Sequence, residues 1–307
     1  MFTFSVSDSF YRFNCQSGIS FDSGIHGVTK MLILPYGNKQ LTNICERAYK
    51  TLDKDLKKVV IYSPTNDDIS EHLDLLNDRE VIVKTCSEDI NPNIIENDTA
   101  LVILTTLSRG FNYNDARDID SFTAGNIEEN KINKDITFEE FSAFEVLSSL
   151  LGYASDKGYS FIRLELANSA DFNTNFASTL GYGAWMLYEG SSAGYVKKYY
   201  SDTVIDFVKF NLKNNMHIAC SECFNFPEVF NQEFKIIISL EKDGFVRGVS
   251  GSFKTREKLF KALVKRSFGV AFSDNRFAPV QPDEIDRLKI NVVLLENNLM
   301  NSVLIES

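Results

Sequence analysis

Short apolar runs alternate with amphipathic stretches along the first part of the chain. The run Met31–Pro35 is followed, between residues 41 and 52, by apolar residues three or four positions apart, which is helical spacing. A second helix is expected at 68–76. Further apolar runs stand at 59–64, 81–83 and 101–104. This alternation predicts a layered α/β domain with a mostly parallel sheet.

The middle of the chain is polar before it becomes amphipathic again. Residues 115–135 are rich in acidic side chains and are expected to form a loop, whereas the apolar spacing over 138–151 predicts a core helix. The small residues at 189–195 predict a linker, so we place a domain boundary between residues 195 and 196. Strands are expected at 161–166 and 184–188.

Residues 196–307 show the pattern of a smaller α+β domain. Apolar residues at helical spacing over 204–210 and 259–268 predict two helices. A buried strand is expected at 235–240, followed by a turn at 242–244, and the last strand is expected at 290–295. We therefore expect two domains, at 1–195 and 196–307, which suits a chain of 307 residues.

The bulk composition is that of a globular protein. The hydrophobic fraction is 44% and the charged fraction 24%, both near the averages for folded domains. No stretch approaches the ~18 apolar residues of a membrane span, and the first residues lack the pattern of a signal peptide. The 5 cysteines are scattered and odd in number, unlike a disulfide scaffold. We expect a cytoplasmic protein that is neither exported nor inserted in a membrane.

The two predicted domains differ in charge. Residues 1–195 hold 28 acidic and 16 basic side chains, and residues 196–307 hold 14 and 16. An acidic first domain repels phosphate backbones, so binding of RNA or another polyanion is expected only in the second domain. Its basic cluster is more simply interpreted as a solvated helix face. The cluster consists of Lys254, Arg256, Lys258, Lys261, Lys265 and Arg266.

Common catalytic motifs are absent from the sequence. It contains no phosphate-binding loop, dinucleotide fingerprint, HExxH zinc motif or GxSxG nucleophile elbow. The histidines His26, His72 and His217 are isolated from one another, which disfavours a histidine-built metal centre. Cys220 and Cys223 have the spacing of half a zinc site or of a redox dithiol, and two packing thiols are the simpler interpretation.

Two segments of the second domain carry a family resemblance. The first, residues 246–251, reads VRGVSG and follows a strand; the second, residues 271–279, reads AFSDNRFAP and follows a helix. In spacing and order they resemble the LRGCIG and AAF-x-D-x-RF-x-P segments of the AMMECR family. The resemblance implies an AMMECR-like α+β domain at 196–307, with Val249 in place of the family's cysteine. It also implies a shortened domain, because family members continue through a further glycine-rich region.

The motif residues include glycines and charged residues, and the aromatic Phe277 is the remaining candidate among them. Gly248 and Gly251 let the backbone turn tightly or approach a neighbour. Arg247 and Arg276 carry forked donors suited to a carboxylate, and Asp274 is the nearest candidate. Two interpretations stay open for the charged residues: an internal ion pair and an anion-binding site.

Four short segments of the first domain carry a second resemblance. Residues 32–37 read LILPYG, residues 59–66 VVIYSPTN, residues 104–109 LTTLSR and residues 180–184 LGYGA. In order they are similar to the PHAG, P-x-H, SSDLSH and VGYGA segments of the Memo family. That family's fold is similar to that of class III extradiol dioxygenases. The resemblance covers residues ~30–190 and implies a layered α/β fold of this type.

At the positions of the Memo family's metal-binding histidines this chain holds other residues. Tyr36, Asn66 and Arg109 replace the three histidines, and Ser142 lies near the family's cysteine. A phenol, an amide and a guanidinium do not reproduce a soft-nitrogen site for iron, copper or zinc. The resemblance therefore implies that no metal or other cofactor is bound. These four residues become candidates to line a cleft for an anionic or aromatic ligand.

Three functions remain open. The favoured one is a non-catalytic or catalytically altered Memo/AMMECR fusion that binds a small molecule or a partner protein. Because both families occur with a radical SAM protein in the AmmeMemoRadiSam set, such a protein is a candidate partner. The second is an enzyme, of dioxygenase-like or modification-pathway type, that uses non-histidine residues in the same cleft. The third is polyanion or RNA binding through the basic helix.

Overall fold

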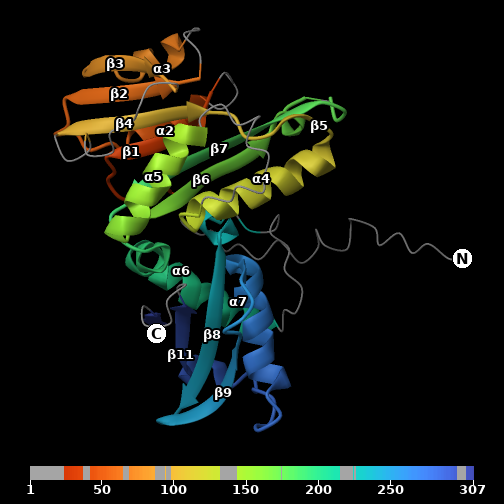
Figure 1. Cartoon of the computed structure of the whole chain (residues 1–307). Helices are drawn as coiled ribbons and strands as arrows, with labels where there is room; N and C mark the ends of the chain where they lie inside the picture. The colour runs from red at the N-terminus through yellow and green to blue at the C-terminus, as the bar shows by residue number, and fades with distance from the viewer. Residues whose placement is uncertain are drawn as a thin grey trace, which may run out of the picture. The chain divides into compact units, whose positions relative to one another are not determined.

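The chain folds into two compact units, each with its own β-sheet (Figure 1). We call residues 25–192 the N-terminal unit, and residues 193–307 with Gly24 the C-terminal unit. The computed structural model describes residues 24–36, 42–64, 69–86, 94, 98–131, 144–173, 175–214, 224, 226–295 and 302–307.

The N-terminal unit is built on a seven-stranded mixed sheet. Its order is β3-β2-β4-β1-β7-β5, and β6 pairs with the opposite edge of β7. The strands are β1 (Met31–Pro35), β2 (Lys58–Ser63), β3 (Glu80–Thr85), β4 (Thr99–Thr105), β5 (Arg109–Phe111), β6 (Ser160–Asn168) and β7 (Thr179–Tyr188). Strands β1 to β4 confirm the four strands predicted from apolar runs.

Only part of this sheet is parallel. β3, β2, β4 and β1 run parallel to their neighbours, whereas β7 is antiparallel to β1, β5 and β6. The prediction of a mostly parallel sheet is therefore wrong. The difference arises from β7, which is antiparallel to each strand that it pairs with. The chain between β6 and β7 reverses direction without the longer crossover that parallel strands need.

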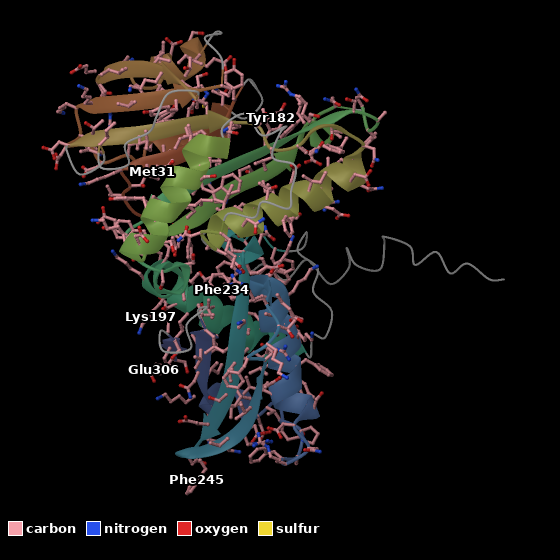
Figure 2. All side chains as sticks on the ribbon, viewed as in Figure 1. Met31, Tyr182, Lys197, Phe234, Phe245 and Glu306 are labelled. Carbon is pink, nitrogen blue, oxygen red and sulfur yellow. The ribbon has the colours of Figure 1, made fainter. Side chains whose placement is uncertain are left out.

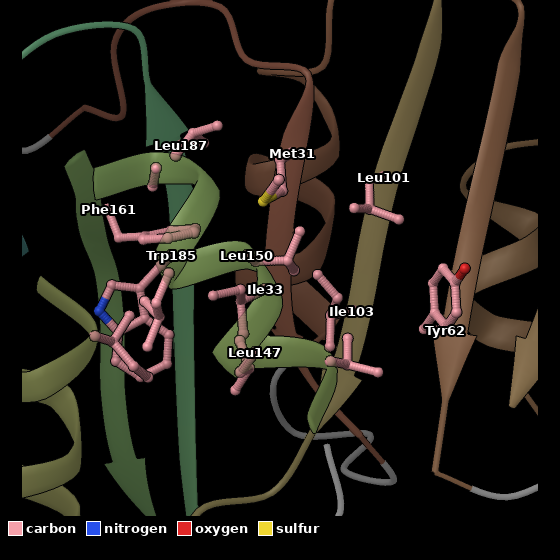
Figure 3. Close-up of a cluster of buried hydrophobic side chains, with 14 of the residues drawn as sticks. Met31, Ile33, Tyr62, Leu101, Ile103, Leu147, Leu150, Phe161, Trp185 and Leu187 are labelled. Atoms are coloured by element: carbon pink, nitrogen blue, oxygen red, sulfur yellow. The ribbon is translucent and has the colours of Figure 1, made fainter. Parts of the chain in front are cut away.

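One face of this sheet packs against α4 and α5 around a cluster of buried hydrophobic side chains (Figure 3). Met31 and Ile33 of β1 meet Leu147 and Leu150 of α5 and the indole of Trp185 in this cluster. The burial of β1 and β4 along their whole length explains why they are continuous apolar runs. The helices of this unit are α2 (Thr42–Tyr49), α3 (Ser70–Asp74), α4 (Tyr113–Glu128), α5 (Phe144–Lys157) and the single turn η4 (Ser169–Asp171).

Helix α4 replaces most of the loop expected at 115–135. Asn112 caps it by accepting hydrogen bonds from the backbone N–H groups of Asn114 and Asp115. The prediction failed because the buried face of α4 contains polar residues, which do not register as an apolar stripe. That face consists of Ala116, Asp120, Thr123, Ala124, Ile127 and Glu128.

A buried ion pair ties α4 to the sheet. Arg163 of β6 donates from Nε and Nη2 to the two carboxylate oxygens of Glu128, at 2.6 and 3.0 Å. Trp185 Nε1 donates to the same carboxylate at 3.1 Å. Because Arg163 and Glu128 are 6% and 9% exposed, neither charge has free access to water, and each depends on the other.

The C-terminal unit contains a five-stranded antiparallel sheet of order β10-β8-β11-β12, with β9 also paired to β8. The expected hairpin turn is confirmed: Asp243 and Gly244 both have positive φ, at 53° and 84°. The strand at 290–295 is not the last, because β12 follows it. The strands are β8 (Glu233–Lys242), β9 (Phe245–Gly251), β10 (Glu257–Lys258), β11 (Lys289–Leu295) and β12 (Val303–Glu306).

Helix α6 occupies much of the predicted linker at 189–195. It begins at Ser192 and runs through the expected domain boundary at 195/196, with one non-helical residue, Tyr200. Of the described helices, none is long and apolar enough to cross a membrane. The helices of this unit are α6 (Ser192–Asn214), η6 (Glu228–Asn231), α7 (Leu259–Phe268), the π-helix η7 (Gly269–Ser273) and η8 (Ile285–Arg287).

Candidate functional site

The parallel strands of the N-terminal sheet end at one edge, which we call the carboxyl edge. β1 and β4 are in register, and the N–H of Tyr36, directly after β1, donates to the carbonyl of Thr105 at the end of β4 (3.1 Å). β7 is antiparallel to β1, so it begins at this same edge. The carboxyl ends of parallel strands are where α/β sheets bind ligands, and Tyr36 lies there as expected from the sequence.

Arg109 lies at the carboxyl edge as well, on the short strand β5. The chain between β4 and β5 is fixed to the start of β7, because Leu107 N–H donates to the carbonyl of Gly181 and Gly181 N–H to the carbonyl of Ser108, both at 2.8 Å. Arg109 then pairs with Leu180, and its side chain is exposed. The guanidinium is therefore held on a fixed backbone and open to solvent.

Hydroxyl side chains recur among the described residues of this edge. Ser63 ends β2, Thr105 ends β4, and Thr106 and Ser108 follow it; each is at most 4% exposed. Among the residues that the structure describes, Ser63 Oγ has no hydrogen-bond partner. Neutral hydroxyls donate to and accept from oxygen ligands, and they are poor ligands for a soft metal ion.

One buried carboxylate, that of Asp120, lies beneath this edge. Its Oδ1 accepts the N–H of Ser108 at 2.9 Å. Burial raises the pKa of Asp120 to about 6, although hydrogen bonds from Ser108 and from the Asn168 side chain favour the charged form. Asp120 thus joins α4, β6 and the segment that leads to Arg109.

Gly181 makes room for the Asp120 carboxylate. A Cβ on Gly181 would lie 2.1 Å from Asp120 Oδ1, so any other residue displaces that side chain. Asp120 and the start of β7 were not predicted as site residues. The only sequence signal for this part of the site was Gly181 in the LGYGA segment. A glycine alone does not indicate which side chain packs against it.

A second polar pair lies next to Tyr36. His72 Nδ1 lies 2.9 Å from the hydroxyl of Tyr49, and His72 also hydrogen-bonds the backbone of Pro35. Burial lowers the pKa of His72 and raises the pKa of Tyr49. Burial also raises the pKa of Cys45, on the same helix as Tyr49, to about 12. Because these groups are neutral and already partnered, we regard them as part of the core.

The other expected site residues of this unit, Asn66 and Ser142, lie outside the described residues. The same holds for His217 and for the Cys220 and Cys223 pair. Among the residues that the structure describes, no three histidine, cysteine, aspartate or glutamate side chains are grouped so that they could hold a metal ion.

In the C-terminal unit the AMMECR-type motif residues gather around β9. Arg276 forks onto Asp274, with Nε at 2.9 Å from Oδ1 and Nη2 at 2.6 Å from Oδ2. Asp274 Oδ2 also accepts the N–H of Val249 at 2.9 Å. Hydrogen bonds from Arg276, then from Val249, hold the pKa of Asp274 well below its ordinary value. Phe277 completes the group, since its ring lies 5.5 Å from the guanidinium carbon of Arg276.

Arg247 does not pair with Asp274, the partner considered nearest in sequence. Its Nη2 donates to Glu284 at 2.6 Å, and Lys242 donates to the other oxygen of Glu284 at 2.6 Å. Burial alone would raise the pKa of Glu284, but hydrogen bonds from Lys242, the Gln281 N–H and Arg247 lower it to about 2. The ion-pair interpretation therefore describes both arginines, through two different carboxylates.

The motif glycines serve close packing rather than a turn. A Cβ on Gly248 would lie 2.3 Å from the carbonyl oxygen of Val270 in η7, and a Cβ on Gly251 would lie 2.6 Å from Ile237 Cγ1. Neither glycine has a positive φ. Close approach is therefore the correct one of the two interpretations made from the sequence.

The basic cluster of the C-terminal unit is partly neutralised. Lys265 and Arg266 both approach Glu257, and Arg256 donates to the carbonyl of Glu233 at 2.6 Å. Lys261 is exposed and lies over the ring of Phe260. This arrangement fits a solvated helix face better than a polyanion-binding surface.

Comparisons with known proteins bear on the C-terminal unit. Residues 204–303 match the family model described as AMMECR1, so the chain contains an AMMECR1 domain. A 69-residue stretch is 36% identical to a Methanothermobacter thermautotrophicus protein; it spans 22% of this chain and 36% of that relative. An uncharacterised protein from Pyrococcus horikoshii, solved by crystallography, aligns with a TM-score of 0.28 and 19% identity over 31% of this chain and 51% of its own.

Proposed function

We propose that the AMMECR1 domain at residues 204–303 is joined to a Memo-like unit, and that the whole chain is a binding protein that works without a bound metal. The N-terminal unit takes an anionic or aromatic small molecule at its carboxyl edge, with Tyr36 and Arg109 as contacts. The four Memo-type segments support this assignment by their order along the chain. In a reducing cytoplasm the buried thiols of Cys45 and Cys86 would remain free.

A single observation carries the proposal: the carboxyl edge holds an exposed guanidinium, that of Arg109, on a backbone that is hydrogen-bonded to the start of β7. The guanidinium of Arg109 forms charge-assisted hydrogen bonds with a carboxylate or phosphate. The Asp120 carboxylate is buried and accepts the N–H of Ser108, so it is not one of the groups that contact the ligand.

The proposal is tested by ligand-induced thermal stabilisation with two probes, benzoate and phenyl phosphate. A ligand that binds only the folded state raises the melting temperature, because it adds a stabilisation of RT ln(1 + [L]/Kd). We expect stabilisation of the wild-type protein and its loss in Arg109→Ala. Lys54→Ala is the matched control, because Lys54 is an exposed cation that precedes β2 and thus lies at the opposite edge of the sheet.

Two results would contradict this function. One is the absence of any stabilisation by either probe at millimolar concentration. The other is equal stabilisation of the wild-type protein and Arg109→Ala, which would place the bound anion elsewhere. Tyr36→Phe separates the two contacts, since it removes the phenol hydroxyl and leaves the ring.

The co-occurrence of the two families with a radical SAM protein supports a second part of the proposal, a protein partner of that class. Mixing the purified chain with such a protein and measuring complex formation by sedimentation tests it. The absence of a complex at tens of micromolar would remove the partner and leave the small-molecule site standing.

A further inference from the structure

The buried carboxylate of Asp120 lies beneath the segment that carries Arg109. Its Oδ1 accepts the N–H of Ser108, the residue before Arg109, at 2.9 Å. Gly181 of β7 leaves the room that the carboxylate fills, since a Cβ there would lie 2.1 Å from Oδ1. Gly181 stands directly before Tyr182, which Figure 2 labels. Asp120 is 3% exposed, so it is separated from solvent by the backbone of the proposed site.

The groups that hydrogen-bond to this carboxylate are neutral. They are Ser108 and the side chain of Asn168, at the end of β6. Asp171 of η4 is a second carboxylate nearby, and it accepts the Tyr113 hydroxyl at 2.8 Å and the Asn168 N–H at 2.7 Å. Burial, and in addition the charge of Asp171, raises the pKa of Asp120 to about 6 against the effect of its hydrogen bonds. No cation in this network fixes Asp120 in its charged form.

The strands that pack against α4 carry few other charges. These strands are β5, β6 and β7. The segment 179–188, which forms β7, has no charged residue, and β6 contributes Glu165 and Arg163, the buried partner of Glu128. β5 contributes Arg109. Among these described strands Arg109 is the exposed cation, so an external anion that approaches this side of the sheet is attracted to a point close to Asp120.

We propose that the carboxyl edge binds its anionic ligand together with a proton, which Asp120 takes up. This inference rests on the proposed function, because the anion is the one that contacts Arg109. A negative charge bound at Arg109 disfavours a second negative charge on the buried carboxylate beneath it. By thermodynamic linkage, the neutral form of Asp120 favours anion binding by the same factor. The site therefore takes an anionic ligand more tightly as the pH falls toward mildly acidic values.

The backbone of the site does not depend on the charge of Asp120. A neutral carboxyl group keeps a carbonyl oxygen that accepts the N–H of Ser108. The N–H of Leu107 donates to the carbonyl of Gly181, and the N–H of Gly181 to the carbonyl of Ser108, both at 2.8 Å. Arg109 thus stays on the same strand in both protonation states. The change in affinity comes from the charge rather than from a rearrangement.

The size of the coupling follows from the separation of the two charges. Ser108 and Arg109 are neighbours, and consecutive Cα atoms lie ~3.8 Å apart, so the carboxylate and the bound anion are on the order of 10 Å apart. Two unit charges at this distance change each other's binding about 2-fold in water-like surroundings and about 15-fold at an effective dielectric constant of ~20. We expect a factor of roughly five at low ionic strength, where screening is weak.

Benzoate binding to the full chain between about pH 5.5 and about pH 8 tests the coupling. Benzoate stays ionised over this range, whereas phenyl phosphate itself takes up a proton near pH ~6. For the wild-type protein in about 10 mM salt, titrations followed by amide chemical shifts should give a Kd roughly threefold to fivefold lower at the acidic end. Adding benzoate to weakly buffered protein near pH ~6.3 should raise the pH, with uptake of roughly 0.4 proton per bound anion.

Asp120→Asn identifies the group that takes up the proton. The amide is neutral at every pH, so this variant should bind benzoate at the alkaline end nearly as tightly as the wild-type protein does at the acidic end. Its affinity should not change with pH, and proton uptake should disappear. Asp118→Asn is the matched control, because Asp118 is an exposed carboxylate on the same helix. It should keep the wild-type pH profile and the wild-type proton uptake.

Each contrary result has a distinct meaning. Wild-type binding that is independent of pH and takes up no proton would overturn the coupling and leave the anion site standing. A pH dependence that persists in Asp120→Asn would overturn it by assigning the proton to another group, such as His72 beside Tyr36. If benzoate binds at no pH, the proposed site fails and the coupling fails with it. Should Asp120→Asn not fold, the carboxyl carbon resonance of Asp120 in the wild-type protein replaces it. Its titration should move to higher pH with benzoate, and an unmoved titration would contradict the proposal.

Discussion

Two carboxylates, one in each unit, have opposite electrostatic surroundings. Asp120 in the N-terminal unit is 3% exposed and receives its hydrogen bonds from neutral groups, the backbone N–H of Ser108 among them. Glu284 in the C-terminal unit is 7% exposed but binds two cations, Lys242 and Arg247. The pKa of Asp120 is raised to about 6 and that of Glu284 is lowered to about 2.

The difference shows that a buried carboxyl group can have its pKa raised or lowered, depending on the groups that hydrogen-bond to it. Loss of water disfavours both charges. The hydrogen bonds from Ser108 and Asn168 do not offset this penalty at Asp120, whereas Lys242, the Gln281 N–H and Arg247 together outweigh it at Glu284. The N-terminal edge therefore keeps a carboxylate that is close to neutral at mildly acidic pH. The AMMECR-type motif surface instead keeps its carboxylates ionised and fixed in ion pairs. The first arrangement suits a site where charge is poised near a ligand, and the second suits a rigid surface.

The largest effect on stability is expected at the pair of Glu128 and Arg163, where a carboxylate is both buried and bound to a cationic partner. Glu128→Ala leaves Arg163 buried without its counter-charge, which should destabilise the N-terminal unit by about 3–5 kcal/mol. Chemical denaturation measures this change. Glu128→Leu combined with Arg163→Met removes both charges and should recover most of the loss. A double variant as unstable as Glu128→Ala would show that packing, rather than the unpaired charge, is responsible.

The next effect is the pH dependence that Asp120 contributes. Its folded-state pKa of about 6 lies above the ordinary value of 3.8, so the folded state binds the extra proton between these values. The contribution is fully present below pH 3.8 and is lost as the pH rises through about 6. A difference of about 2 units at 1.36 kcal/mol each amounts to about 3 kcal/mol.

Asp120→Asn isolates that contribution. The amide cannot ionise, so the slope of stability between pH 4 and 6 should flatten relative to the wild type, as measured by denaturation at each pH. An unchanged slope would mean that Asp120 is not the group that titrates. Gly181→Ala offers a second perturbation of the same site, because its Cβ displaces the carboxylate.

Glu284 should show the opposite sign with a similar amplitude. Its folded-state pKa of about 2 lies below the ordinary 4.5, so its contribution is present above pH 4.5 and is lost as the pH falls toward 2. Glu284→Gln removes the charge that Lys242 and Arg247 share, and hydrogen bonds to charged groups are worth about 1.5–3 kcal/mol. If Glu284→Gln lost no stability at pH 7, the ion-pair account of this surface would be wrong.

The smallest effect on stability is expected at Asp274. Arg276, its ionic partner, has a side chain that is 60% exposed, so water replaces much of what Asp274→Ala removes. The melting temperature should change little. Hydrogen exchange of the Val249 amide should accelerate, because that N–H loses its acceptor. Unchanged exchange at Val249, with neighbouring amides as the control, would contradict the hydrogen bond.

The strands were predictable because their burial leaves a direct signal. β1 and β4 are buried along their whole length, and β8 contains the apolar run Ile236–Ile238, so all three strands could be identified from the sequence. Helix α4 was missed for a physical reason: Asp120 and Glu128 lie on its buried face, and their partners come from distant strands. Sequence periodicity detects apolar burial but not polar burial that is compensated by tertiary contacts.

At the candidate sites, contacts between residues close in sequence were easier to predict than contacts between distant residues. Asp274 and Arg276 are two residues apart, and their ion pair was one of the two interpretations that the sequence left open. Arg247 and Glu284 are 37 residues apart, and no local pattern links them. Tyr36 and Arg109 were placed at one edge by a family resemblance rather than by spacing. The groups that shape that edge, Asp120 and Gly181, become visible only once β7 is in place.

Elemental analysis of the untagged protein, purified without added chelator or metal, tests the central claim most directly. A site of hydroxyl, phenol and guanidinium groups predicts iron, copper and zinc far below one equivalent per chain, with no loss of stability on dialysis against a chelator. A stoichiometric transition metal that is lost, together with stability, on chelation would contradict the account of the carboxyl edge.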